Sequence, residues 1–153
     1  MEDIIENSRK FLLHNPEYNQ VVIDWINFGN RANYHKISKS NLTKFTIKYD
    51  NLLTMIEKLL VNANIKTTSE IILNRETSFP ISDIPLLTAT TSREEPPGCF
   101  GDIFYSVIIP KDTPIFFINA LDLNKGLPLI ETEEEFLIGP VKTKLINNKI
   151  YIY

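Results

Sequence analysis

The chain has 153 residues, a formal net charge of −3 and 43% hydrophobic residues, a balance typical of one globular domain and unlike that of a disordered chain. The acidic balance offers no basic surface to a nucleic-acid backbone. No apolar stretch reaches the ~18–20 residues of a membrane helix, and the acidic start lacks a signal-peptide profile, so we expect no membrane insertion and action in the cytoplasm. The single cysteine, Cys99, cannot form an internal disulfide.

Residues 1–66 are predicted to be mainly helical, because apolar residues recur at helical spacing. Asn15 is the expected N-cap of the second helix, with Pro16 at its first position, and Asp50 is the expected N-cap of the last helix. Trp25 lies on an apolar helix face and is expected in the core. The predicted helices cover Asp3–Leu13, Pro16–Phe28, parts of Ser40–Tyr49, and Asp50–Ala63.

Residues 67–153 are predicted to be mainly β-structure, since short β-branched and aromatic runs alternate there with Pro, Gly, Asn and Asp. Asn147 and Asn148 are expected to form a hairpin turn. Helices followed by strands indicate an α+β fold, which we expect to form one domain over residues 1–153. The predicted strands are Glu70–Arg75, Leu86–Thr91, Asp102–Ile109, Pro114–Ile118, Glu133–Ile138, Lys142–Ile146 and Lys149–Tyr153.

An acidic run leads into the strand that begins at Glu133. Side chains alternate between the two faces of a strand, so Glu133 and Glu135 point to the same side and can direct two carboxylates into one cleft. Taken alone, such a pair is more often a solvated strand entrance than a catalytic site.

Two further segments carry candidate chemistry. Arg75 ends an apolar strand, where a guanidinium suits bidentate phosphate binding, although a surface arginine paired with an acid is as common. The segment Leu86–Ser92 is rich in hydroxyl groups, which β-propensity alone also explains.

Other nucleotide and metal chemistries find no support in the sequence. With five glycines there is no GxGxxG turn and no phosphate-binding P-loop. The two histidines and Cys99 lack metal-ligand spacing, so we expect no metal site.

Taken in order, these segments resemble the arginine, S-T-S and E-x-E pattern of the cholera-toxin-like, arginine-type mono-ADP-ribosyltransferases. The likeness is carried by the arginine-bearing "EIILNRETSFP", the hydroxyl-rich "LLTATTSRE", the strand pair "FYSVIIPKDTPIFFI" and the acidic "ETEEEFLIGPVKTKLI". The resemblance implies two small packed β-sheets around an NAD cleft, with the helices on the N-terminal side.

The resemblance also implies roles for individual residues. Glu135 would be the catalytic carboxylate, and Glu133 would receive the acceptor, an arginine side chain of a protein. NAD, as co-substrate, would be bound by Arg75, Thr88, Thr90 and Phe100, and Thr88 would hold the side chain of Glu135 by a hydrogen bond. A monomer that acts as a toxin-like viral or microbial effector would fit the family.

Two departures from the family pattern keep alternatives open. Ala89 stands at the central S-T-S position, and Glu76 stands where the family usually has glycine after its arginine. The alternatives are a catalytically degenerate protein-binding module and an NAD glycohydrolase that uses water as its acceptor.

Overall fold

The computed structural model describes residues 2–25, 43–77, 87–90, 103–118, 135–139 and 141–153, and all structural statements below refer to these residues. The helical elements are α1 (Glu2–His14), the short 3-10 helix η1 (Pro16–Tyr18), the helical residues 19–25, and α3 (Thr43–Ala63). The strands are β1 (Ile71–Thr77), β2 (Leu87–Thr90), β3 (Ile103–Ile109), β4 (Ile115–Phe117), β5 (Glu135–Ile138), β6 (Thr143–Ile146) and β7 (Lys149–Ile152). The predicted α+β class is confirmed.

Asn15 holds the N-cap position of η1, as expected, and it also closes the end of α1. Both the backbone N–H and the side-chain Nδ2 of Asn15 donate to the carbonyl oxygen of Phe11, each over 2.9 Å. Asn15 therefore closes the C-terminus of α1, and its side chain makes no capping bond to the 3-10 helix that follows. Pro16 does occupy the start of that helix, as expected.

The long helix α3 corrects the expectation for Asp50. Asp50 was expected to cap the start of a helix, but α3 begins at Thr43 and runs on through Asp50. The segment 43–50 contains neither glycine nor proline, so no residue in it interrupts the helix.

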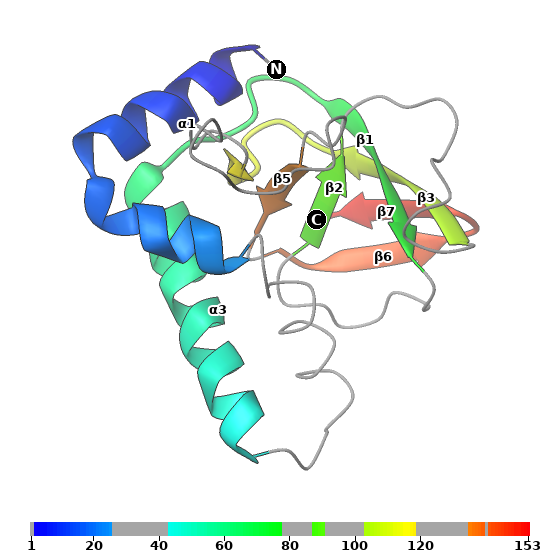
Figure 1. The fold of residues 1–153 in the computed structure, drawn as a ribbon. Coiled ribbons are helices and arrows are strands. Elements are labelled where there is room, and N and C mark those ends of the chain that lie inside the picture. The colour runs from blue at the N-terminus through cyan, green and yellow to red at the C-terminus, as the bar shows by residue number, and fades with distance from the viewer. Residues whose placement is uncertain (1, 26–42, 78–86, 91–102, 119–134, 140) are drawn as a thin grey trace.

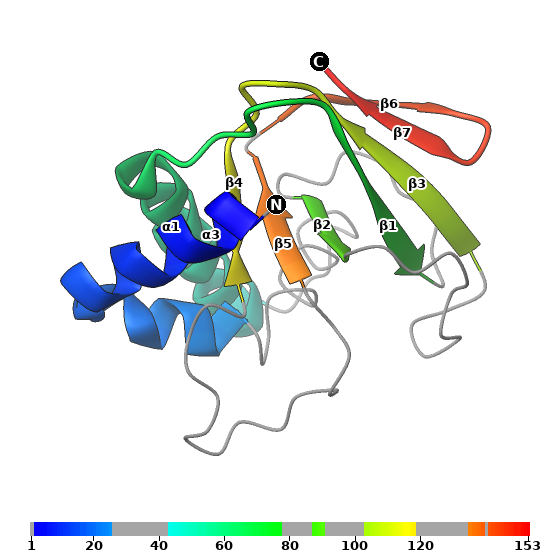
Figure 2. The same ribbon diagram turned by 90° about the horizontal axis from the view of Figure 1, so that it is seen from above.

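Seven strands follow the order β4-β5-β2-β1-β3-β7-β6. The two halves of this order, β4-β5-β2 and β1-β3-β7-β6, meet at one pair of described residues, Asn74 and Thr90. Figure 2 shows the halves diverging from this junction, with α1 and α3 beside β4 and β5 and with β6 and β7 at the far end. This arrangement matches the expected two small sheets with helices on one side, which Figure 1 also shows.

Two apolar clusters hold the layers together. One lies between the sheet halves and joins Leu73, Val107 and Ile150 to Phe136 and Ile138 of β5. The other joins the helices to β4 and β5; its members include Leu12, Val22, Trp25, Leu53, Ile56, Leu59, Phe116 and Leu137. Trp25 is 2% exposed, as its apolar helix face predicted. Because β5 contributes to both clusters, its position is fixed from both faces.

The hairpin of β6 and β7 turns at Asn147 and Asn148, as predicted. Asn147 adopts a φ of 54°, a left-handed conformation that asparagine tolerates better than most residues. In the part of the chain that the structure describes, no helix combines the length and apolarity needed to cross a membrane.

Candidate active site

The candidate site lies where β1, β2 and β5 run side by side. Thr90 of β2 is the register partner of Glu135 on β5 and of Asn74 on β1. Residues directly opposite each other across antiparallel strands lie on the same face of the sheet. One row thus crosses three strands from Asn74 through Thr90 to Glu135, joining segments that are far apart in the sequence.

Glu135 begins β5 at the margin of the helical layer. It is partly buried, and the three residues that follow it in β5 are fully buried. Glu135 and Leu137 share a face of β5 because side chains alternate along a strand. Leu137 packs in the cluster formed with the helices. The carboxylate therefore stands at the open end of a face that is closed further along by apolar side chains.

Thr88, the residue expected to hold Glu135, is the register partner of Leu137, and the β2 residue opposite Glu135 is Thr90. Thr88 and Thr90 are therefore both in the strand next to Glu135, two residues apart. Ala89, at the position where the family has its central hydroxyl, pairs with Phe136.

Arg75 follows Asn74 on β1 and pairs with Tyr105 of β3. The Arg75 side chain is only 7% exposed. By the alternation of side chains along β1, Arg75 lies on the face of Leu73, and Asn74 lies on the face of the row that contains Glu135. The structure thus brings the strand of Arg75 next to Thr90 and Glu135, but the residue of β1 in their row is Asn74.

Asn74 was not singled out by the sequence. A pattern of apolar and polar residues does not reveal which residue of one strand stands opposite which residue of another, so only the register identifies it. Glu133 and Phe100, the remaining predicted site residues, lie outside the described residues.

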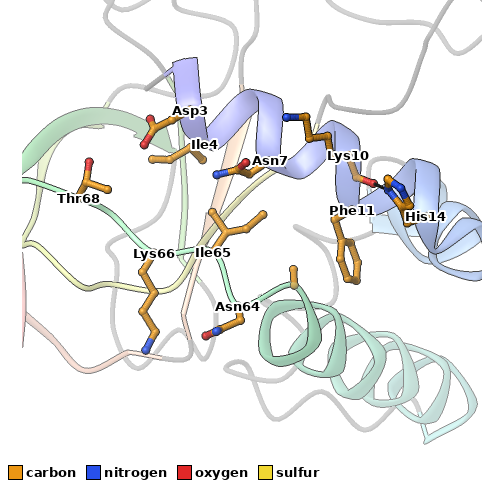
Figure 3. Close-up of a pocket in the computed structure, with 11 residues that line it drawn as sticks. Asp3, Ile4, Asn7, Lys10, Phe11, His14, Asn64, Ile65, Lys66 and Thr68 are labelled. Carbon is orange, nitrogen blue, oxygen red and sulfur yellow. Dashed lines mark hydrogen bonds between the residues drawn. The ribbon is translucent and has the colours of Figure 1, made fainter.

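A separate groove of about 460 Å³ lies between α1 and the connection from α3 to β1. Figure 3 shows Asn7 and Lys10 of α1 on one side of this groove and Asn64 and Lys66 on the other. None of the described candidate site residues lines it. The groove is adjacent to the segment that precedes β1, whereas Asn74 is the middle residue of that strand.

No family model matches the chain, and no curated protein matches it in sequence. Solved structures do match. Two crystal forms of the C3larvin toxin, an ADP-ribosyltransferase from Paenibacillus larvae, each align over 90% of this chain. The first covers 87% of the toxin chain with a TM-score of 0.53 at 8% identity. The second, orthorhombic form covers 94% of the toxin chain with a TM-score of 0.54 at 9% identity. The similarity lies in the fold, and the chain has the fold of an ADP-ribosyltransferase.

Proposed function

We propose that the chain is an NAD-dependent mono-ADP-ribosyltransferase with Glu135 as its catalytic carboxylate. The observation that carries this proposal is the register pair of Thr90 and Glu135 within a fold shared with an ADP-ribosyltransferase toxin. The two residues were selected from their sequence motifs, and they stand opposite each other in adjacent strands.

The proposed reaction breaks the bond between C1′ of the nicotinamide ribose and the nicotinamide nitrogen. Nicotinamide leaves with the bonding electron pair, and positive charge develops on the ribose. A carboxylate that accepts a hydrogen bond from the ribose 2′-hydroxyl stabilises this charge, as in glycoside hydrolysis. Glu135 supplies that carboxylate, and its partial burial strengthens the electrostatic interaction relative to water.

We further propose that the acceptor is an arginine side chain. A guanidinium nitrogen forms the new bond to C1′ and loses a proton. Glu133 precedes Glu135 by two residues, and a carboxylate binds the planar guanidinium through two parallel hydrogen bonds. The arginine acceptor rests on this E-x-E pattern. In this scheme Glu133→Gln loses transfer to a guanidino acceptor and retains release of nicotinamide.

The predicted contact between Arg75 and the NAD diphosphate has its own test. Arg75→Lys keeps the positive charge and removes the planar fork, so a diphosphate contact predicts a raised KM for NAD with a smaller change in kcat. A loss of thermal stability with an unchanged KM would instead assign Arg75 to the packing of β1 against Tyr105.

The proposed function is tested by nicotinamide release from NAD, with agmatine as a guanidino acceptor. Wild-type protein should release nicotinamide and form ADP-ribosyl-agmatine, and Glu135→Gln should lose about 10²–10³ in kcat. Glu6→Gln, an exposed glutamate of α1 with the same chemical change, is the matched control.

The products separate the alternatives. Free ADP-ribose as the sole product, formed in a Glu135-dependent manner, identifies an NAD glycohydrolase. If ADP-ribose is transferred to peptides with other nucleophilic side chains but not to agmatine, the acceptor is one of those side chains and not arginine. A folded wild-type protein that leaves NAD intact contradicts the enzymatic proposal and favours the protein-binding module.

A further inference from the structure

The two ends of the seven-stranded sheet differ in how their outer edges are covered. At one end, two outward backbone N–H groups of β4 are bonded. The N–H of Ile115 donates to the carbonyl oxygen of Ile65 over 3.0 Å, and the N–H of Phe117 donates to Ser8 Oγ, also over 3.0 Å. The segment before β1 and the helix α1 therefore close this edge.

At the other end, β7 is the one described strand that pairs with β6. The turn holds two residues, so Ile146–Lys149 and Lys144–Tyr151 are the hydrogen-bonded pairs of the hairpin. The bond of 3.0 Å from the N–H of Tyr153 to the carbonyl of Lys142 continues the same alternation.

The backbone groups between these pairs point away from β7. They are the N–H and C=O of Thr143 and Leu145, and no described residue forms a hydrogen bond with them. Rows of such groups at a sheet edge are a template for a further strand. Among the described residues, the outward groups of β6 are unbonded, whereas the outward N–H groups of Ile115 and Phe117 in β4 are bonded.

The side chains of β6 give this edge two chemically different faces. On one face Leu145, 44% exposed, lies next to Ile150, which is 1% exposed and belongs to the core between the sheet halves. On the other face Lys142 and Lys144 are exposed, and Tyr151 pairs with Lys144. Because side chains alternate along β6, the face of Lys142 and Lys144 also carries Ile146, which is 45% exposed. One face is therefore apolar at Leu145, and the other combines two lysines with an exposed isoleucine.

We propose that β6 binds an extended segment of another protein in which acidic and aliphatic residues alternate, added as an eighth strand. Its backbone would pair with Thr143 and Leu145. Its aliphatic side chains would extend the apolar face next to Leu145. Its carboxylates would lie against Lys142 and Lys144, since cross-strand neighbours of opposite charge stabilise a sheet. This proposal is independent of the enzymatic function.

The local charge selects an acidic partner and disfavours a second copy of the chain. The chain as a whole carries a net charge of −3. Residues 141–153 nevertheless contain three lysines and no acidic residue. Pairing of two β6 strands would bring Lys142 and Lys144 of both copies onto one face, where like charges repel. The lysines therefore oppose self-association and favour a carboxylate-bearing strand.

The test uses three fluorescein-labelled ten-residue peptides and fluorescence anisotropy. The first alternates glutamate and valine, the second carries prolines at two of the valine positions, and the third alternates lysine and valine. The first peptide alone has both the negative charge and a backbone N–H at every position, because the second lacks two N–H groups at its prolines and the third is positively charged. It should therefore bind at least about tenfold more tightly than the other two. Equal binding of the first two peptides would overturn strand addition, and so would failure of the first to bind.

A matched pair of variants locates the site. Lys142→Glu combined with Lys144→Glu should weaken binding of the acidic peptide by about tenfold or more. Lys10→Glu combined with Lys66→Glu makes the same charge change at exposed lysines of the groove in Figure 3 and should alter binding by less than about twofold. Equal losses in the two double variants would show that net charge alone attracts the peptide.

Hydrogen exchange measured by NMR provides a readout specific to the backbone. Addition of the acidic peptide should slow exchange of the amides of Thr143 and Leu145, which point outward from β6, and change that of Lys144, already bonded to β7, much less. Binding without this pattern would place the peptide elsewhere and overturn the proposal. Dimerisation of the wild-type protein through β6, detected by sedimentation together with the same protection in the absence of peptide, would also overturn it.

Discussion

The strands β5 and β6 have the same length and differ in almost everything else. Each has four residues, and each contains at least two large aliphatic or aromatic side chains. In β5, Phe136, Leu137 and Ile138 are fully buried, whereas Leu145 and Ile146 of β6 are 44% and 45% exposed. β5 lies between β4 and β2 with a core on each face, and β6 has one neighbour. The place of a strand in the sheet thus decides its role. An interior strand such as β5 is packed on both faces, whereas an edge strand such as β6 leaves backbone groups on its outer side for a partner.

The sharpest test of this contrast is one substitution made in both strands. Leu137→Ala should lower the free energy of unfolding by about 2–5 kcal/mol, because it leaves a cavity in the cluster with the helices. Leu145→Ala removes the same atoms from an exposed site and should cost less than about 1 kcal/mol. Urea unfolding measures both, and similar losses would contradict the assignment of β5 as interior and β6 as edge.

The second prediction concerns Glu135, the proposed catalytic carboxylate, which is held by the buried strand β5. Glu135→Gln should reduce kcat for nicotinamide release by about 10²–10³, equivalent to about 3–4 kcal/mol of barrier, because the amide lacks the charge that stabilises the ribose cation. The melting temperature should stay close to that of the wild type. Retained activity in a folded variant would remove Glu135 from the proposed mechanism.

Ser8 tests how the edge of β4 is closed. Its buried Oγ donates to the carbonyl oxygen of Ile4 over 2.8 Å and accepts the N–H of Phe117. Ser8→Ala leaves that buried N–H without its acceptor and should destabilise the fold by about 1–3 kcal/mol. Asn7→Ala, at the exposed neighbouring position, should cost less than about 0.5 kcal/mol. Alanine is the best helix former, so neither substitution should lose stability through the helix itself. A loss for Asn7→Ala as large as that for Ser8→Ala would contradict the assignment of the Ser8 effect to the edge contact.

Asn74 should give the smallest of these effects. It stands in the row of Thr90 and Glu135 and is proposed to position that row rather than to contact the reacting atoms. Asn74→Ala should lower kcat for nicotinamide release by about tenfold, roughly 1.4 kcal/mol, with little change in KM. Ile72→Ala, on the same face of β1 but 60% exposed, should leave both constants unchanged. A rise in KM alone would make Asn74 a binding residue.

Much of the local structure could be predicted from the sequence. The strands from Glu70 onward, the burial of Trp25 and the turn at Asn147 all follow from spacing and from conformational preferences that act over a few residues. The E-x-E motif also identified Glu135 as the candidate catalytic residue. These features depend on contacts between near neighbours in the chain, which a linear pattern records.

The tertiary structure decided the rest. Asn15 holds the expected N-cap position of η1, but its bonds to the carbonyl oxygen of Phe11, which close α1, depend on how the chain turns there. The row of Asn74, Thr90 and Glu135 and the contrast between the edges of β4 and β6 depend on strand order and register. The period of two along a strand specifies which face a residue takes but not which strand will lie beside it. Strand order is set by packing between segments that are distant in the chain, and for that reason only the folded structure reveals it.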